Sequence, residues 1–181
     1  VTACSRGVWE FAEWEWELLQ REGASMAAWW REHLKGCKAL KLEGMSKSVA
    51  LRVASCRFAQ GVTGRAQQAA QTAGVSLFAV WQGVFAAWAL RHVEEEVRDV
   101  LVVGPYGRRD MAQFQRTVGY LLNMMVYRYR AEVLDGMDLV GLARESGRVV
   151  AETIERGGNY PFARLMREAG VANAERWMDV M

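Results

Sequence analysis

The hydrophobic pattern at the start of the chain predicts two helices. Over residues 8–21, tryptophans and other apolar residues recur at spacings that fit one broad helical face. Ser25 is a candidate cap for a second helix, which runs to Lys35 with Gly36 just past its end. Residues 38–47 then form a connecting loop, so the first part of the chain is predicted to be helical.

The central part of the chain changes from a strand pattern to helix patterns. Residues 48–58 have apolar positions at every second residue, which predicts a strand. Thr63 is a candidate cap for a short helix that ends at Gly74, and Ser76 for a helix over residues 77–92. That last helix is apolar on nearly every face, so we expect it to be buried.

The remaining elements are two strands and two helices. Residues 100–103 are a short apolar run that Gly104 and Pro105 end, and residues 118–130 alternate as a strand with both faces mostly covered. A long amphipathic helix begins at Asp138, and a short helix ends at Ala169. This order of elements predicts an α/β layer in which helices pack on few strands.

Composition narrows the class of protein. The 181 residues fit one compact domain, and 23 basic and 21 acidic residues are well mixed, so no nucleic-acid partner is implied. Cys4, Cys37 and Cys56 lie far apart, which argues against a zinc site or a disulfide framework and suits the cytoplasm. The longest apolar run, residues 75–90, is too short for a membrane span. Residues 1–6 show neither an initiator methionine nor a signal peptide, so we expect a chain cut from a longer one.

Searches for catalytic motifs find little. Residues 104–108 lack the spacing of a phosphate-binding glycine loop. His33 and His92 are interpreted as helix-end or surface histidines, because neither has a nearby serine, cysteine or second histidine as a catalytic partner. Residues 127–130 interleave tyrosine and arginine, which a half-exposed strand explains better than nucleic-acid binding.

Five tryptophans near the start of the chain need an explanation of their own. They are Trp9, Trp14, Trp16, Trp29 and Trp30. Aromatic residues at helical spacing are more often core than a ligand platform, so we expect these side chains to be buried. A ligand platform is the alternative.

A series of short segments has a recognisable order. The segments are residues 11–15 with 29–36, residues 74–80, residues 99–108, residues 118–124 and residues 157–163. Together they resemble the ordered motifs of condensation domains of nonribosomal peptide synthetases. The most specific match is residues 118–124, Val-Gly-Tyr-Leu-Leu-Asn-Met, which is similar to the family's Ile-Gly-x-Phe-Val-Asn-Thr.

The chain also departs from the family pattern. Met124 stands where the family has threonine, and Gly157 and Gly158 stand where it has His-Gln, although Tyr-Pro-Phe follows as expected. The family's Arg-Asp-x-Ser-Arg-Asn-Pro run is not recognisable in residues 171–176. These differences leave room for a specialised, epimerising, cyclising or degenerate member.

The resemblance implies a fold and a domain organisation. Condensation domains consist of two similar α/β halves in a V, with a tunnel between them, as in chloramphenicol acetyltransferase. We therefore expect an α/β, mixed-sheet sandwich that is the C-terminal subdomain of such a domain. Residues 1–181 would form this single subdomain, with linker helices in residues 1–47 and the α/β core in residues 48–181.

The resemblance also implies an activity. The family joins a carrier-bound donor acyl or peptidyl group to the amine of a carrier-bound aminoacyl thioester. Its His-His-x-x-x-Asp-Gly motif belongs to the other half and is absent from these residues, so no catalytic residue is assigned and the chain alone is expected to be inactive. The candidates for the tunnel wall are Tyr106, Arg108 and Asn123. Arg108 is equally open to interpretation as a solvated loop cation, and Asn123 as a structural amide with a backbone partner.

Partners follow from the same resemblance. No cofactor is expected to bind directly; phosphopantetheine is presented by carrier domains. The expected partners are the N-terminal half, peptidyl or acyl carrier domains and a neighbouring adenylation domain, with no nucleic acid and no membrane. An exposed half-tunnel face would favour self-association of the chain. The alternatives are a non-catalytic docking or recruitment module, or another acyltransferase of the same fold.

Overall fold

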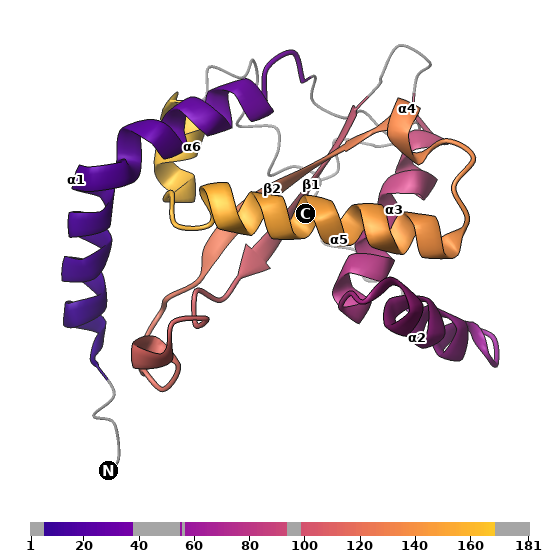
Figure 1. The fold of residues 1–181 in the computed structure, drawn as a ribbon, viewed down its shortest axis with the longest axis horizontal. Helices are drawn as coiled ribbons and strands as arrows, with labels where there is room; N and C mark the ends of the chain where they lie inside the picture. The colour runs from indigo at the N-terminus through magenta and orange to yellow at the C-terminus, as the bar shows by residue number, and fades with distance from the viewer. Residues whose placement is uncertain (1–5, 38–54, 56, 94–98, 169–181) are drawn as a thin grey trace. The chain divides into compact units, whose positions relative to one another are not determined.

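The computed structural model describes residues 6–37, 55, 57–93 and 99–168 (Figure 1). The elements in chain order are α1 (Val8–His33), α2 (Val62–Ala73), α3 (Leu77–Leu90), β1 (Asp99–Tyr106), the short 3₁₀ helix η1 (Ala112–Phe114), β2 (Asn123–Arg130), α4 (Ala131–Leu134), α5 (Leu139–Gly157) and α6 (Phe162–Glu168). The chain divides into two compact units. The first unit takes its described residues from 1–39, 103–127 and 151–181, and the second from 40–102 and 128–150.

The two helices predicted for the first part of the chain are one continuous helix, α1, so that prediction is wrong. Ser25 does not cap a new helix; its hydroxyl donates to the carbonyl of Glu22 at 2.9 Å, in the preceding turn. Figure 1 shows α1 bending along its length, and Gly23 together with this back-bonded serine is a combination that bends helices without ending them. The helix ends at His33, two residues before the predicted end at Lys35, and the turn past it contains Gly36, whose φ is 75°.

Two helices of the second unit, α2 and α3, begin and end close to the predicted positions. Helix α2 is capped by Gly61 rather than Thr63, and it ends at Gly74, whose φ of 70° is the left-handed conformation that glycine adopts easily. The Ser76 cap is confirmed, because its Oγ accepts a hydrogen bond from the backbone N–H of Ala79 at 3.2 Å. Local capping chemistry therefore sets most of these boundaries.

Helix α3 is buried on one face only. Val80 is buried in an apolar cluster with Ala66 and Ala70 of α2 and Ala143 of α5. The opposite side exposes large apolar side chains: Phe78, Phe85 and Trp88. The prediction that this helix is buried is therefore wrong for these three residues.

The strands β1 and β2 form a two-stranded sheet. Strand β1 continues through Gly104 and Pro105, which do not end it as predicted, and β2 begins at Asn123 rather than at residue 118. Arg128 Nη2 lies 2.8 Å from Asp99 Oδ2, so β1 begins beside the end of β2. The predicted strand over residues 48–58 lies almost entirely outside the described residues.

The alternation predicted for β2 is confirmed on one face, where residues 121, 123, 125, 127 and 129 are all buried. The hydroxyl of Tyr129 donates to Gln82 Oε1 at 2.7 Å and lies 2.7 Å from Ser146 Oγ, which links β2 to α3 and α5 within the second unit.

Helix α5 starts as predicted, with Asp138 Oδ1 accepting from the Gly141 N–H at 2.7 Å. Helix α4 was not predicted.

No single helix in the described residues is long and apolar enough to cross a membrane. Helices α2 and α3 taken together reach that length and apolar content, but the pair is bent by 108°. The α/β class is confirmed by this mixture of helices and paired strands. The division into linker helices at 1–47 and a core at 48–181 stays a prediction.

Candidate functional site

The three residues predicted to line a tunnel all belong to the first unit. Tyr106 ends β1, Arg108 follows it in the loop before η1, and Asn123 begins β2. Strand and loop therefore place them within one compact part of the chain. The environments of the three side chains differ.

Arg108 is buried, with 4% of its surface exposed. Its Nη1 donates to Glu15 Oε1 of α1 at 2.5 Å, and its guanidinium carbon lies 4.7 Å from the ring centre of Phe11 and 5.8 Å from that of Trp14. The interpretation of Arg108 as a solvated loop cation is therefore wrong. A buried cation needs this combination of a carboxylate and aromatic faces to offset its desolvation.

Two nitrogens of the Arg108 guanidinium, Nε and Nη2, have no hydrogen-bond partner among the residues that the structure describes. Arg108 also has a φ of 49°, an uncommon conformation for a residue with a Cβ. The burial and the backbone geometry both show that the loop is built to hold this side chain against α1. This pairing is not predictable from sequence spacing, because Glu15 lies 93 positions away from Arg108.

The loop after Arg108 is fixed by its neighbour, Arg109. Arg109 Nη1 donates to the carbonyl of Thr117 at 2.5 Å, and Nη2 donates to that of Gly119 at 3.1 Å. The hydroxyl of Thr117 in turn donates to the carbonyl of Arg6 at 2.5 Å. Arg109 is not recognisable from the sequence, because a loop arginine that bonds to backbone carbonyls has no distinctive spacing.

Asn123 is a fully bonded structural amide. Its Nδ2 donates to the carbonyls of Gly158 at 3.0 Å and Tyr160 at 2.9 Å, while its Oδ1 accepts from the backbone N–H of Phe162 at 3.0 Å. The interpretation of Asn123 as an amide with backbone partners is thus confirmed. The amide fixes the turn between α5 and α6, and its role in a tunnel wall stays a prediction.

Tyr106 meets the same turn from the other strand. A Cβ added at Gly158 would lie 3.0 Å from Tyr106 Cε1, and Gly158 also accepts the bond from Asn123. Burial, followed by a hydrogen bond with Asp110, raises the pKa of Tyr106 well above its usual value. The phenol therefore stays protonated to a more alkaline pH than a free tyrosine, and its hydrogen bond is made with Asp110. Tyr106 and Asn123 come together at Gly158, whereas Arg108 packs against α1.

The Gly-Gly departure from the family pattern has a physical cause. A Cβ at Gly157 would lie 2.6 Å from two ring atoms of Trp30 and 2.7 Å from one of Trp29, and Trp30 Nε1 donates to the Gly157 carbonyl at 3.3 Å. At Gly158 a Cβ would lie 2.5 Å from the Ile154 carbonyl oxygen. The space that a histidine and a glutamine would need at these positions is therefore filled.

The predictions for the histidines are confirmed, and those for the tryptophans are confirmed only in part. His33 and His92 lie at or just past the ends of α1 and α3, which confirms the helix-end interpretation. Of the tryptophan cluster, Trp30 is fully buried, but Trp9 and Trp16 are exposed by 80% and 65%. The core prediction is wrong for these two.

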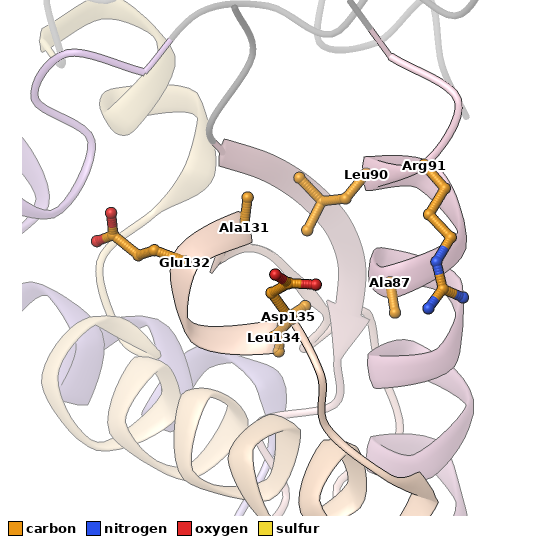
Figure 2. A pocket seen from close by; sticks show the side chains of 7 residues that line it. All are labelled: Ala87, Leu90, Arg91, Ala131, Glu132, Leu134 and Asp135. Carbon is orange, nitrogen blue, oxygen red and sulfur yellow. The ribbon is translucent and has the colours of Figure 1, made fainter. Parts of the chain in front are cut away.

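The second unit has a small hollow between α3 and α4 that contains none of the predicted site residues. It has a volume of about 200 Å³ and is lined by Ala87, Leu90, Arg91, Ala131, Glu132, Leu134 and Asp135. Figure 2 shows the Asp135 carboxylate turned toward α3 and the Glu132 carboxylate turned away. This volume is below the range of about 300 to 1,000 Å³ that is typical of small-molecule sites.

The described residues contain no group of three histidine, cysteine or acidic side chains placed to hold a metal ion. Residues 5–180 match the family model of the condensation domain. The chain belongs to the condensation-domain family. The resemblance carried by the five ordered motifs is thereby confirmed.

Known proteins are similar to the chain in sequence or in fold. Polyketide synthase PksN of Bacillus subtilis (strain 168) is 25% identical over 177 residues, which are 90% of this chain but 3% of PksN. The first condensation domain of the calcium-dependent antibiotic synthetase superposes with a TM-score of 0.75 at 19% identity, over 95% of this chain and 38% of that one. The X-domain from teicoplanin biosynthesis, solved in complex with OxyB, has a TM-score of 0.67 at 17% identity, over 90% of this chain and 37% of that one.

These similarities confirm the predicted fold class, the α/β fold of condensation domains. They also show that this condensation-domain chain spans only a part of the proteins it resembles. The activity and partners of a whole synthetase are therefore matters for proposal.

Proposed function

We propose that the chain forms one wall of the substrate tunnel in a condensation domain that makes amide bonds between carrier-bound thioesters. The observation that supports this most is the bonding of Asn123. This residue comes from the most specific family motif, and its amide fixes the turn of the Tyr-Pro-Phe motif, 35 to 39 residues away. Two separate motifs of the family are thus joined by one side chain.

The proposed reaction places clear demands on the other half of the domain. The acceptor amine attacks the donor thioester carbonyl, a C–N bond forms, the C–S bond breaks, and the donor's phosphopantetheine thiol is released with a proton. A general base would accept the proton from the amine. His33 and His92 are the two histidines of the chain and are not adjacent, so the His-His-x-x-x-Asp-Gly motif must come from elsewhere.

In this proposal the described residues position and enclose the substrates. Tyr106 lies beside the turn that Asn123 fixes, and its hydroxyl is held by the hydrogen bond with Asp110, so its ring contributes shape to the wall. Both arms of the reaction carry phosphopantetheine, and both carrier domains would approach the assembled domain rather than this chain alone. A chain without a base of its own is expected to show no activity by itself.

The test is reconstitution. The chain is combined with an N-terminal half that contains the histidine motif, and with one donor-loaded and one acceptor-loaded carrier domain. Intact-mass spectrometry of the acceptor carrier measures the amide product. Product from the combination, but from neither half alone, supports the proposal. No product from a combination that forms a stable complex would contradict it, and a histidine-to-alanine variant of the N-terminal half gives the background rate.

A second candidate is a non-catalytic module that recruits another protein. The observation that favours it is the filled space at Gly157 and Gly158, where the family has His-Gln. The fold is also shared with the teicoplanin X-domain, whose structure was solved in complex with OxyB. In the reconstitution experiment this candidate predicts a stable complex of the two halves without amide formation.

A further inference from the structure

An unusual surface lies on the first half of α1. Trp9 and Trp16 are seven residues apart, which places them on the same side of a helix, and both are exposed. The other side of the same helix is core, because Phe11 and Trp14 pack with Phe114. Tryptophan is highly buried on average, so two exposed indoles on one helical face need a reason.

The two tryptophans border a shallow groove. Its lining consists of Trp9, Ala12, Glu13, Trp16 and Glu17. The small side chain of Ala12 leaves room between the rings, and the carboxylates of Glu13 and Glu17 are exposed beside it. Within the described part of the chain, neither carboxylate has an ion-pair partner. We call this surface the α1 groove.

We propose that the α1 groove binds arginine or lysine side chains of a basic protein segment. A cation between the indole faces is attracted by the negative face of each ring, and the carboxylates at its edge supply the opposite charge. The planar guanidinium group of arginine fits this arrangement best, since it stacks on aromatic rings and bonds to carboxylates at the same time.

The charge of the α1 groove argues against nucleic acids, anionic lipids and purely apolar segments as its occupant. Nucleic acids and anionic lipid surfaces carry phosphate groups, which Glu13 and Glu17 would repel. A purely apolar segment would have to cover the two carboxylates and pay for their desolvation without a compensating bond. A basic segment satisfies both the rings and the carboxylates.

This inference is separate from the proposed tunnel function. Among the three candidate tunnel residues, Arg108 contacts α1. Its guanidinium is already bonded to Glu15, which lies on a different face of the helix. The α1 groove therefore has its own unfilled acceptors. Loss of amide formation in the reconstitution experiment would leave the binding prediction unchanged.

The test is a titration of the full chain with a short peptide of alternating alanine and arginine, followed by the indole N–H signals in ¹H–¹⁵N NMR spectra. The control peptide carries citrulline, the neutral counterpart of arginine. We expect the signals of Trp9 and Trp16 to shift with the arginine peptide, with affinity falling as salt is added. The citrulline peptide is expected to bind much more weakly.

Variants locate the binding. Trp9→Ala and Trp16→Ala are each expected to weaken binding about two- to fivefold, the amount that an exposed cation–π contact contributes. Glu13→Gln with Glu17→Gln is expected to weaken it to a similar extent. Trp88→Ala, which removes an exposed tryptophan on α3, is the matched control and should leave binding unchanged.

Three results would overturn the proposal. They are equal binding of the arginine and citrulline peptides, unchanged binding by the Trp9→Ala/Trp16→Ala double variant, and equal losses in Trp88→Ala and the groove variants. Sedimentation of the chain without peptide adds a further check. Self-association that the double variant abolishes would show instead that a second copy occupies the α1 groove.

Discussion

The side-chain oxygen of Asn123 accepts a hydrogen bond from the backbone N–H of Phe162 at 3.0 Å, across 39 positions of the chain. This N–H belongs to the first residue of α6, so the bond satisfies a donor that a helix leaves free at its start. The same amide binds the carbonyls of Gly158 and Tyr160. One side chain therefore fixes both ends of the α5–α6 turn.

Replacing Asn123 should destabilise the fold before it affects chemistry. Asn123→Ala leaves two carbonyls and one N–H without partners in a buried place, and we expect the free energy of unfolding to fall by about 2 to 4 kcal/mol. Asn123→Asp keeps the acceptor for the Phe162 N–H but turns a second oxygen toward the two carbonyls. We therefore expect its free energy of unfolding to be no higher than that of Asn123→Ala. Urea unfolding followed by circular dichroism measures both.

The exposed side chain of Gln113 on η1 provides the matched control for Asn123. Gln113→Ala should change the unfolding free energy by less than about 0.5 kcal/mol. If Asn123→Ala keeps wild-type stability but lowers the rate of amide formation in the reconstituted domain, Asn123 contacts substrate and the structural interpretation is wrong.

The Arg108–Glu15 pair should behave as a buried ion pair. Glu15→Gln leaves the Arg108 cation with 4% exposure and no carboxylate, so we expect a loss of about 2 to 4 kcal/mol in the free energy of unfolding. Arg108→Met removes the cation and keeps an apolar stem over the ring of Phe11. The double variant should be more stable than Glu15→Gln alone.

A double-mutant cycle of Glu15→Gln and Arg108→Met measures this coupling by chemical unfolding. The exposed pair of Arg148 and Glu145, on α5, is the comparison. Its coupling should be below about 1 kcal/mol. Equal coupling energies for the two pairs would show that burial contributes nothing to the Arg108 interaction.

Local features of the fold were predictable from the sequence, and long-range ones were not. The caps at Ser76 and Asp138 were predicted because a capping side chain acts within three residues of itself. The break predicted before Ser25 was wrong, because Leu18 and Trp30 are buried on either side of it and their packing holds one helix together. Tertiary packing outweighs a weak local stop signal.

The candidate site shows the same limit. Asn123 and Tyr106 are identified through family motifs. Their contact with Gly158 depends on the turn between α5 and α6 lying against the sheet, and hydrophobic periodicity does not predict which turn packs there. The burial of Arg108 runs against the usual exposure of arginine, and its partner lies on a distant helix. Trp9 and Trp16 have the spacing of core residues, and only the packing of α1 shows which face is exposed.

Gly157 should tolerate no side chain. The Cβ of Gly157→Ala would lie 2.6 Å from the Trp30 ring, so the indole has to move, and we expect a loss of about 1 to 3 kcal/mol in unfolding free energy. Gly64→Ala, inside α2 with no atom within 4 Å of its added Cβ, is the control and should stabilise by about 0.5 to 1 kcal/mol. Thermal unfolding of both variants checks this. Equal stability changes would show that the indole rings give way without cost.

Alkaline pH should destabilise the fold through Tyr127. Burial raises the pKa of Tyr127 from 10.0 to about 12, because the phenolate form is disfavoured in a side chain with 1% exposure. The raised pKa in the folded state means that its contribution to stability is complete below pH 10 and is lost as the pH rises toward 12. Between pH 9 and pH 11 we expect this group to lower the unfolding free energy by about 1 kcal/mol. Urea unfolding at both pH values, for the wild type and Tyr127→Phe, isolates the effect, since all other titrating groups are shared. An identical pH dependence in the two proteins would mean that Tyr127 ionises as easily in the folded chain as in the unfolded one.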